Sequence, residues 1–281
     1  MLSMKRIVIL KDFCFPVDKY LISAIIPRWR NMGHEVIVTD FLQDNLPEAD
    51  VAFLHIDQTE VPNSFFGRLS KYPEVLNHKV KDISKSRISN NILGPDDSYP
   101  GLVIIKTKAN CGGIPEMQMK LAKQNVVGNI ERRMTWKEVD VLDHRNYPIL
   151  NNMNNVPFDV WNNSKLIVEK FIPEREGELF FLRYYIFLGQ SEWASRFGAK
   201  EPVVHFSNMA TEDLPVAIPE ELQALRKKLG FDYGRFDYVI HNGKPVLFDV
   251  NKTIGGGRSP QLLEAYSDKL DYLAEGINTF C

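Results

Sequence analysis

The stretch FDYVIHNGKPVLFDVN, residues 236–251, carries most of the information about this chain. Two apolar runs flank an Asn-Gly pair, an arrangement that strongly indicates a β-hairpin. Asp237 lies in the first run, and Asp249 and Asn251 lie at the end of the second. Residues two apart in an extended strand point to the same face. We therefore expect Asp249 and Asn251 to share a face of the hairpin, and Asp237 on the partner strand can face the same space.

These three side chains offer two carboxylates and an amide oxygen, which are the hard ligands required by Mg²⁺ that bridges phosphate groups. The alternative is that they form the polar face of a solvated hairpin. Asp249, however, ends a strongly apolar strand, and the glycine-rich segment 253–257 follows it. Glycine allows the backbone to approach a ligand closely. We therefore expect a metal site formed by Asp237, Asp249 and Asn251.

Two lysines precede this hairpin in positions suited to phosphate. Lys106 ends an apolar strand and is followed by a turn that contains Gly112 and Gly113. A lysine at a strand end beside free backbone N–H groups is suited to holding phosphate. Lys85 lies on a helix expected over 83–93. The alternatives are that either lysine, Lys85 above all, is an ordinary surface lysine and that the glycine pair is a simple turn.

A strand expected over 166–172 contains Glu169 and Lys170, and Glu176 and Glu178 follow it. A strand that leaves the core offers backbone N–H and C=O groups to the edge of an adenine, and a later carboxylate can accept hydrogen bonds from ribose hydroxyls. Taken alone, the same residues are a strand end and a charged loop. The sequence does not decide between Glu176 and Glu178 as the ribose ligand.

The N-terminal part alternates between strands and a helix. The expected elements are strands over 5–10, 35–38 and 50–55 and a helix over 17–32. Strand–helix–strand order with short connections is typical of a small parallel sheet of Rossmann-like character. The Gly-x-Gly-x-x-Gly turn of dinucleotide-binding proteins is missing, so we assign no cofactor to this part.

The remaining segments give weaker patterns. We expect a helix over 116–127, an irregular connection over 143–163, a strand over 180–188 that continues the sheet begun at 166–172, and a helix over 219–229.

Composition excludes several classes of function. The 281 residues carry a formal net charge of −2 at pH 7, so no broad basic field indicates nucleic-acid binding. No apolar run reaches the roughly 18–20 residues needed to cross a bilayer. Cys14, Cys111 and Cys281 lie far apart and form neither a disulfide framework nor a zinc motif, so we expect a reduced, cytoplasmic setting. No histidine is placed in the sequence to support a nucleophilic role for Cys111.

The order of these features resembles the ATP-grasp superfamily, the group that includes glutathione synthetase, D-alanine–D-alanine ligase and the ribosomal-protein S6 glutamate ligase. A lysine helix, a strand lysine with a glycine turn, an acidic hinge strand, an arginine strand and an Asp…Asp-x-Asn set follow one another over residues 77–257. The single motifs are loose, whereas their joint order and spacing are specific. The resemblance implies an α/β (α+β) ATP-grasp fold, with a small Rossmann-like N-terminal domain and two subdomains that clasp ATP.

The resemblance also implies domain boundaries. They are 1–78 for the small N-terminal domain, 79–165 for the central ATP-grasp subdomain, and 166–281 for the C-terminal ATP-grasp subdomain with the metal site.

Position by position, the resemblance implies roles for single residues. The nucleotide would be held by two phosphate-binding lysines, a mobile glycine loop, an adenine hinge and a ribose carboxylate. The corresponding residues are Lys85, Lys106, Gly112, Gly113, Glu169, Lys170, Ile172 and Glu176. Arg183 and Arg196 resemble catalytic arginines that face the reacting phosphate. The metal ligands correspond to Asp237, Asp249 and Asn251.

The implied activity is that of an ATP- and Mg²⁺-dependent carboxylate–amine or carboxylate–thiol ligase, which forms an acyl phosphate and releases ADP, with Mn²⁺ as a substitute metal. Its partners would be a small-molecule carboxylate and an amine, with neither nucleic acid nor membrane, and the many dimers of the superfamily allow a homodimer. Asp249 stands where the family usually has glutamate, and the Asp-x-Asn form also occurs in inositol-phosphate kinase branches. The alternatives are therefore a small-molecule kinase acting on a hydroxyl and a non-catalytic ATP-binding module.

The sequence does not specify the substrate. From the architecture of the family, Asp57, Thr59 and Asn63 form one wall of the substrate site. Arg235 and Arg258 lie near the metal hairpin, where each either contacts an anionic substrate or lies on solvated surface.

Overall fold

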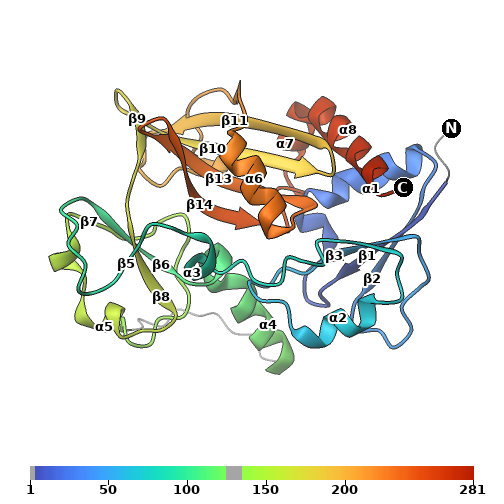
Figure 1. The fold of residues 1–281 in the computed structure, drawn as a ribbon, viewed down its shortest axis with the longest axis horizontal. Helices are drawn as coiled ribbons and strands as arrows, with labels where there is room; N and C mark the ends of the chain where they lie inside the picture. The colour runs from blue at the N-terminus through green and yellow to red at the C-terminus, as the bar shows by residue number, and fades with distance from the viewer. Residues whose placement is uncertain (1–3, 125–134) are drawn as a thin grey trace.

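The computed structural model describes residues 4–124 and 135–281, and these residues form three β-sheets. Figure 1 shows the large C-terminal sheet lying above the other two, with the N-terminal sheet on the right and a small central sheet on the left. The helices at the two ends of the chain lie beside each other on the right of the same view.

The N-terminal sheet is parallel, with the strand order β2-β1-β3-β4. Its strands are β1 (Arg6–Lys11), β2 (Glu35–Asp40), β3 (Val51–His55) and β4 (Glu74–Leu76). The expected strand–helix–strand order is confirmed, because α1 (Ile22–Asn31) connects β1 to β2. Between β3 and β4 lies α2 (Asn63–Leu69), and neither α2 nor β4 was predicted.

The helix expected over 17–32 is divided into two pieces. A 3-10 helix spans Val17–Lys19, and α1 begins only at Ile22. Tyr20 between them is extended and forms a bridge with Gly255, far along the chain. The helix is therefore interrupted by a tertiary contact, which the local sequence pattern could not indicate.

The central sheet is antiparallel, with the strand order β5-β8-β6-β7. Its strands are β5 (Ile92–Leu93), β6 (Val103–Thr107), β7 (Ile149–Leu150) and β8 (Leu166–Lys170). Helix α4 (Ile114–Gln124) follows β6, and α5 (Phe158–Trp161) precedes β8. The helix expected over 116–127 corresponds to α4, although its last three positions lie outside the described residues. The connection expected to be irregular, 143–163, contains β7 and α5.

The helix expected over 83–93 is wrong beyond its first turn. Helix α3 spans only Lys85–Ile88. Ser89 then accepts a hydrogen bond from Asn91 N at 3.1 Å, a local interaction that competes with helical pairing. The last two residues of the expected helix form β5 and pair with β8.

The C-terminal sheet is antiparallel, with the order β12-β11-β10-β13-β14, and β9 also pairs with β10. Its strands are β9 (Glu174–Glu176), β10 (Leu179–Leu188), β11 (Ser191–Ala199), β12 (Leu214–Val216), β13 (Tyr233–His241) and β14 (Lys244–Asn251). The hairpin of β13 and β14 is as expected, with Asn242 and Gly243 at φ +51° and +75° in its two-residue turn. Helix α6 (Glu220–Leu229) covers the face of the sheet away from the N-terminal domain and ends at left-handed Gly230, also as expected.

Two helices that were not predicted close the chain, α7 (Pro260–Ala265) and α8 (Ser267–Glu275). Helix α8 packs on α1, and Trp29 Nε1 donates to Ala274 O at 2.9 Å. The same hydrophobic cluster contains Ile9 of the N-terminal sheet, Tyr184 of the C-terminal sheet and Leu273 of α8. One core therefore joins the two ends of the chain.

The pairing of β8 changes the expected division of the chain. Sequence reasoning joined 166–172 and 180–188 in one sheet, but β8 pairs with β5 and β6, whereas β10 pairs with β11 and β13. Proline at 173 stands between the two strands, where continued strand pairing is disfavoured. We propose three segments, one around each sheet, with the second boundary placed after Lys170.

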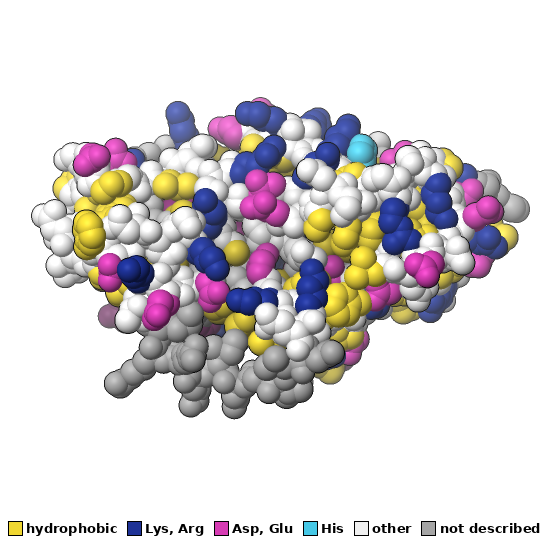
Figure 2. All heavy atoms as spheres, turned by 90° about the horizontal axis from the view of Figure 1, so that it is seen from below, with side chains coloured by type: hydrophobic (Ala, Val, Ile, Leu, Met, Phe, Trp, Pro, Cys, Tyr) yellow, Lys and Arg dark blue, Asp and Glu magenta, His cyan; other side chains and the backbone are white. Residues whose placement is uncertain are grey.

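The surface agrees with the modest net charge. Figure 2 shows Lys and Arg interspersed with Asp and Glu over the described part of the face seen from below. In the described residues, the structure contains no helix that is long and apolar enough to cross a membrane.

Candidate active site

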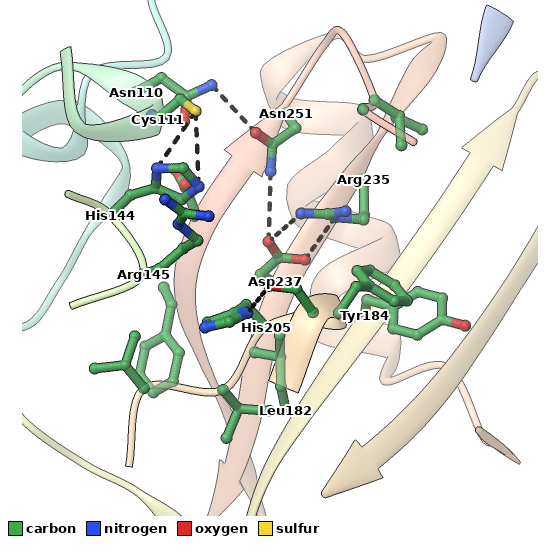
Figure 3. Close-up of a pocket in the computed structure, with 18 of the residues that line it drawn as sticks. Asn110, Cys111, His144, Arg145, Leu182, Tyr184, His205, Arg235, Asp237 and Asn251 are labelled. Carbon is green, nitrogen blue, oxygen red and sulfur yellow. Dashed lines mark hydrogen bonds and ion pairs between the residues drawn. The ribbon is translucent and has the colours of Figure 1, made fainter. Parts of the chain in front are cut away.

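The hairpin of β13 and β14 places four polar side chains on one face of the large sheet. Asp237 pairs with Asp249 across the hairpin, and Arg235 pairs with Asn251. Directly opposed residues of an antiparallel pair point to the same side, as do residues two apart. All four line one cavity of about 510 Å³, and Figure 3 shows Arg235, Asp237 and Asn251 beside one another. The structure therefore brings together the three residues expected to bind metal.

The pairing is irregular beside Asp237. Asp237 pairs with Asp249, whereas the next residue, Tyr238, pairs with Leu247. Phe248 is thus an extra residue, a β-bulge, and bulges are frequent next to active sites. Phe248 and Asp249 both line the cavity, although consecutive residues of a regular strand point to opposite faces. The bulge allows an aromatic ring and a carboxylate at adjacent positions to face the same space.

Arg235 and Asp237 form a buried ion pair at the centre of the site. Arg235 Nη2 donates to Asp237 Oδ2 at 2.8 Å, and Arg235 Nε lies 2.8 Å from Oδ1. Burial raises the pKa of Asp237, and the charge of Arg235 acts in the opposite direction. Asn251 Oδ1 accepts a hydrogen bond from Asn110 Nδ2 at 3.1 Å. The sequence left open whether Arg235 contacts an anion or solvent, and the structure places it in the cavity, whereas Arg258 is an exposed residue paired with a surface aspartate.

Lys85 is a buried residue of the cavity wall. It is the first residue of α3, and its side chain is only 3% exposed. Lys85 Nζ donates to Ala109 O at 3.0 Å and lies 3.6 Å from Asp249 Oδ1. Positive charge beside the expected metal ligands is suited to phosphate oxygens. The structure therefore disfavours the interpretation of Lys85 as a surface lysine.

Lys106 faces the cavity from β6 and is held by a buried carboxylate. Lys106 Nζ lies 2.6 Å from Glu169 Oε2, and both side chains are almost fully buried. It also lies 5.2 Å from the centre of the Phe248 ring. Glu169 does not itself line the cavity. Its carboxylate is therefore placed to hold Lys106 rather than to contact a base directly.

The expected adenine hinge lies partly in the cavity. Lys170 lines it, as do Phe171 and Pro173, whereas Ile172 does not. Phe171 and Pro173 are two residues apart, so in an extended segment their side chains point to the same side. The expected hinge segment thus lies at the cavity, but Ile172, the residue expected to contribute, lies between the two lining positions.

The two expected arginines belong to an ion-pair cluster outside the cavity. Arg183 Nη2 lies 2.7 Å from Glu174, and Arg196 Nη1 lies 2.6 Å from Glu176. Hydrogen bonds from Arg196 lower the pKa of Glu176, which is exposed. None of these four residues lines the cavity, and neither does Glu178. The structure does not bring Arg183, Arg196 or Glu176 to the expected metal ligands.

The alternation of side chains along β10 accounts for this difference. Tyr184 is the cross-strand partner of Asp237 and therefore shares its face. Arg183 precedes Tyr184 and points to the other face, where Arg196 is its partner on β11. Arg235 lies two residues from Asp237 on the same strand, so its side chain lies on the face of Asp237, opposite to the face of Arg183.

Gly112 and Gly113 lie in a tightly packed turn. Both have positive φ, +69° and +80°. A Cβ on Gly112 would overlap Leu142 O, and one on Gly113 would lie 2.6 Å from another backbone oxygen. Leu142 N also donates to Gly112 O at 3.0 Å. The resemblance implies a mobile glycine loop over the phosphates, whereas here the glycines are buried and Asn110 and Cys111 line the cavity.

Cys111 has a histidine neighbour that sequence reasoning missed. Its Sγ lies 3.8 Å from His144 Nδ1, and both residues line the cavity (Figure 3). Burial raises the pKa of Cys111 to about 11, and Asp57 and Asp249 add to this effect; burial also lowers the pKa of His144. At neutral pH the pair is a neutral thiol beside a neutral imidazole, unlike an activated thiolate. The two positions are 33 apart in the chain, so no local pattern of residues indicates their contact.

Polar groups from the N-terminal domain close one end of the cavity. Asp57 lines it and accepts hydrogen bonds from Tyr20 Oη and Thr253 Oγ1, each at 2.6 Å. Thr59 is buried, and its hydroxyl oxygen accepts a hydrogen bond from the backbone N–H of Asn110 at 2.8 Å. This bond links the wall to the glycine turn. Of the three residues expected in the wall, Asp57 alone faces the cavity, since Asn63 lies elsewhere on α2.

The oxygen atoms of Asp237, Asp249 and Asn251 fit a magnesium ion. Asp237 Oδ1 is a buried carboxylate oxygen whose ion-pair partner is Arg235 Nε at 2.8 Å, and it is of the oxygen type that Mg²⁺ prefers. Among the described residues, no three His, Cys, Asp or Glu side chains form a metal cluster by themselves. Two carboxylates and the amide of Asn251 are nevertheless a common protein contribution to Mg²⁺, which usually completes its octahedron with phosphate oxygens and water.

Comparison with solved structures identifies the fold. The macrocyclase MdnC of Microcystis aeruginosa, solved with its precursor peptide MdnA, superposes with a TM-score of 0.52 at 11% identity, covering 96% of this chain and 98% of that chain. A RiPP-associated ATP-grasp ligase of Chryseobacterium gregarium, in complex with ADP and a leader and core peptide, gives 0.52 at 12% identity, covering 97% and 96%. The ATP-grasp ligase PsnB, complexed with a minimal precursor, gives 0.50 at 12% identity, covering 95% and 99%.

These matches run over almost the whole chain, and they show that it has the ATP-grasp fold. The fold class expected from the order of motifs is therefore confirmed. No protein-family model matches the sequence, and no curated protein does.

Proposed function

We propose that the protein is an ATP- and Mg²⁺-dependent ligase that joins a carboxylate to an amine through an acyl phosphate and releases ADP. The observation that carries this proposal is the clustering of Asp237, Asp249 and Asn251 with Lys85 and Arg235 in one cavity. The ATP-grasp fold supports it, because a structure with this fold is described as a ligase in complex with ADP. A fold alone does not define a reaction, so the charged cluster is the main support.

Lys85, Arg235 and the nearby Lys106 each already have a carboxylate partner. The pairs are Lys85 with Asp249, Lys106 with Glu169, and Arg235 with Asp237. On nucleotide binding we expect the lysines and the arginine to turn toward phosphate oxygens, while Asp237, Asp249 and Asn251 hold the metal. When bound there, Mg²⁺ neutralises charge on the phosphate oxygens. Mn²⁺ is expected to substitute, because it accepts the same oxygen ligands.

The protein would position the reactants and stabilise charge without reacting itself. A carboxylate oxygen of the substrate forms a bond to the γ-phosphorus as the bond to the β–γ bridging oxygen breaks and ADP leaves. The amine nitrogen then forms a bond to the acyl carbon, phosphate leaves, and the nitrogen loses a proton to solvent. Arg235 is the residue placed to stabilise the transferred phosphoryl group, because it shares the cavity with the proposed metal ligands.

We propose small molecules as both substrates. A cavity of about 510 Å³ that must also hold ATP leaves room for a compact acceptor. MdnC and the Chryseobacterium gregarium ligase were each solved with a peptide, so a peptide carboxylate is the competing acceptor.

A kinase that phosphorylates a hydroxyl is the second candidate. Asp249 supports it, because aspartate in place of the usual glutamate resembles the inositol-phosphate kinase branches of the superfamily. The same cluster of cations would serve both reactions, since each transfers the γ-phosphoryl group of ATP.

One experiment separates these functions. Purified protein is incubated with Mg²⁺-ATP and a metabolite extract, and nucleotides and masses are compared with a reaction lacking protein. We expect ADP together with a product equal to two metabolites joined with loss of water. A metabolite heavier by one phosphoryl group would instead establish the kinase. ATP binding without any ADP formation would leave an ATP-binding module.

The metal assignment is tested with Asp249→Ala and Asn251→Ala. Each should lower kcat by about 10²–10³-fold, the scale measured when one group that stabilises transition-state charge is removed. Asp159→Ala, an exposed aspartate on α5, is the matched control and should retain wild-type turnover. Near-wild-type turnover of both site variants would disprove the assignment.

A further inference from the structure

The cavity continues past the proposed metal ligands along the same face of the sheet. Cross-strand pairing joins Asn251 to Arg235, Arg235 to Ile186, and Ile186 to Trp193, in a row over β14, β13, β10 and β11. All four residues line the cavity. Neighbouring strands are about 4.8 Å apart, so this row extends about 14 Å from its charged end to Trp193. The far half of the row is apolar.

The apolar end of the row packs with two helices. Leu262 of α7 and Leu270 of α8 line the cavity and belong to the same hydrophobic cluster as Ile186 and Trp193. Tyr184 and Tyr266 also line the cavity. Their hydroxyls donate hydrogen bonds at 2.6 Å and 2.8 Å to Asp213, a residue that does not line the cavity. Figure 3 shows the Tyr184 hydroxyl directed away from Asp237 and Arg235. The aromatic faces, rather than the hydroxyls, are therefore presented to a ligand.

Trp193 lines the far end of the cavity. Its Nε1 is buried, so the residue presents apolar ring surface rather than its N–H group to the cavity. The chamber formed by Ile186, Trp193, Leu262 and Leu270, which we call the apolar chamber, thus offers hydrophobic surface.

We infer that the carboxylate substrate bears an aromatic or branched aliphatic group, which occupies the apolar chamber while its carboxylate lies at Arg235 and Asn251. This inference rests on the proposed ligase function. The register of four strands supports it, because the apolar chamber is the direct continuation of the charged row. A small or doubly charged acid would leave the chamber unfilled or bring a second charge into apolar surroundings, which is costly.

The test uses hydroxylamine as the amine, so that the natural amine need not be known. Hydroxylamine attacks the acyl phosphate, forming a hydroxamate and releasing phosphate. The full-length protein is assayed for ADP and hydroxamate with phenylalanine, leucine, 3-phenylpropionate and 4-methylpentanoate, and with alanine, acetate, aspartate and succinate. We expect kcat/KM to be at least about 10-fold higher for the apolar acids, since even one methylene in a hydrophobic pocket changes it by about 10–200-fold.

Leu262→Phe tests the position of the chamber. Leu262 is only partly buried, so we expect this variant to fold. The added ring should narrow the chamber, lowering kcat/KM at least 10-fold for 3-phenylpropionate while changing that for acetate less than threefold. Leu263→Phe is the matched control, because Leu263 is the next residue of α7 and does not line the cavity. It should leave the preference among acids unchanged.

The outcomes are distinct. Hydroxamate formed equally well or better from the polar acids would overturn the inference and leave the ligase intact, as would a Leu262→Phe variant that slows all acids alike. No hydroxamate from any acid, with ATP binding detected by calorimetry, would overturn the ligase function itself. A shift of preference in Leu262→Phe but not in Leu263→Phe would establish the apolar chamber as the substrate pocket.

Discussion

The side of a strand on which an arginine lies decides whether it can reach the cavity. Arg235 shares the face of Asp237, whereas Arg183 and Arg196 lie on the opposite face and pair with Glu174 and Glu176. All three arginines occur in similar apolar-rich strands. The sequence alone therefore did not separate them, because their faces depend on the register among β10, β11 and β13.

We predict that Arg235→Ala lowers kcat for ADP formation by about 10²–10³-fold, because it removes charge stabilisation at the proposed site of phosphoryl transfer. Arg196→Ala should stay within threefold of the wild type. Steady-state ADP release measures both, and thermal unfolding checks that each variant is folded, since Arg235→Ala also leaves Asp237 unpaired. Equal losses in the two variants would contradict the assignment of Arg235.

The thiol of Cys111 allows a prediction about pH. With its pKa raised to about 11, only on the order of 10⁻³ of this thiol is ionised at pH 8, and the thiolate is the reactive form. In a variant with Cys14→Ser and Cys281→Ser, the rate of alkylation by iodoacetamide should be slow at pH 7.5 and rise about tenfold per pH unit up to pH 9.5. A rate that levels off below pH 9 would show that the thiol has a lower pKa.

At the scale of elements, the glycine turn is a tightly packed connection beside the site. Gly112 has φ +69°, and a Cβ there would overlap Leu142 O. Gly177 has φ +59°, and no atom lies within 4 Å of the position that a Cβ would occupy, so a side chain there would meet the backbone strain without the overlap. Comparing alanine variants at Gly112 and Gly177 therefore separates the cost of backbone strain from the cost of steric overlap.

We predict that Gly112→Ala lowers the free energy of unfolding by about 2–5 kcal/mol, from about 1–2 kcal/mol of left-handed strain and about 1–3 kcal/mol of overpacking. Gly177→Ala should lose only the strain. Urea unfolding followed by circular dichroism gives both values. Equal losses would show that the backbone around Gly112 relaxes and that the turn is looser than its contacts indicate.

The elements that the sequence predicted well carry their own local signals. The hairpin of β13 and β14 has an Asn-Gly turn and apolar strands, and α6 has a proline at its start and Gly230 at its end. The helix expected over 83–93 failed because Ile92 and Leu93 are satisfied by pairing with β8, a contact with a distant segment. Helices α7 and α8 were missed because their apolar faces are explained only by the elements that they cover.

The same difference between local and distant information applies to the site. Asp237, Asp249 and Asn251 lie in one hairpin, so their shared face could be predicted from spacing. The contact of Cys111 with His144 depends on a distant loop, and the sequence could not indicate it.

At the scale of the whole molecule, α8 links the two ends of the chain through one core. Leu273 is fully buried in the cluster that also contains residues of the N-terminal and C-terminal sheets. The N-terminal wall of the cavity, with Asp57, is therefore held in place partly by the last helix. We expect the two parts to unfold together.

We predict that Leu273→Ala lowers the free energy of unfolding by about 2–5 kcal/mol, the usual cost of a buried leucine cavity. Tryptophan fluorescence and far-ultraviolet circular dichroism should give coincident urea transitions in the wild type and in the variant. Glu275→Ala, an exposed position at the end of the same helix, should change stability by less than about 0.5 kcal/mol. Two separate transitions would show that the ends of the chain are independent units.

The extra residue at Phe248 has a consequence for the length of the hairpin. Asp237 would stand opposite Asp249 in an uninterrupted ladder that lacked Phe248, just as it does in the present one. A deletion of residue 248 would therefore leave the carboxylates of Asp237 and Asp249 on the same face of the hairpin. It would remove only the aromatic ring beside Lys106. A residue inserted into the regular part of β14 and absorbed into its pairing would instead rotate Asp249 and Asn251 to the opposite face. A change of length at the irregular position of this strand is thus compatible with the proposed metal ligands, whereas one within the regular ladder would displace them.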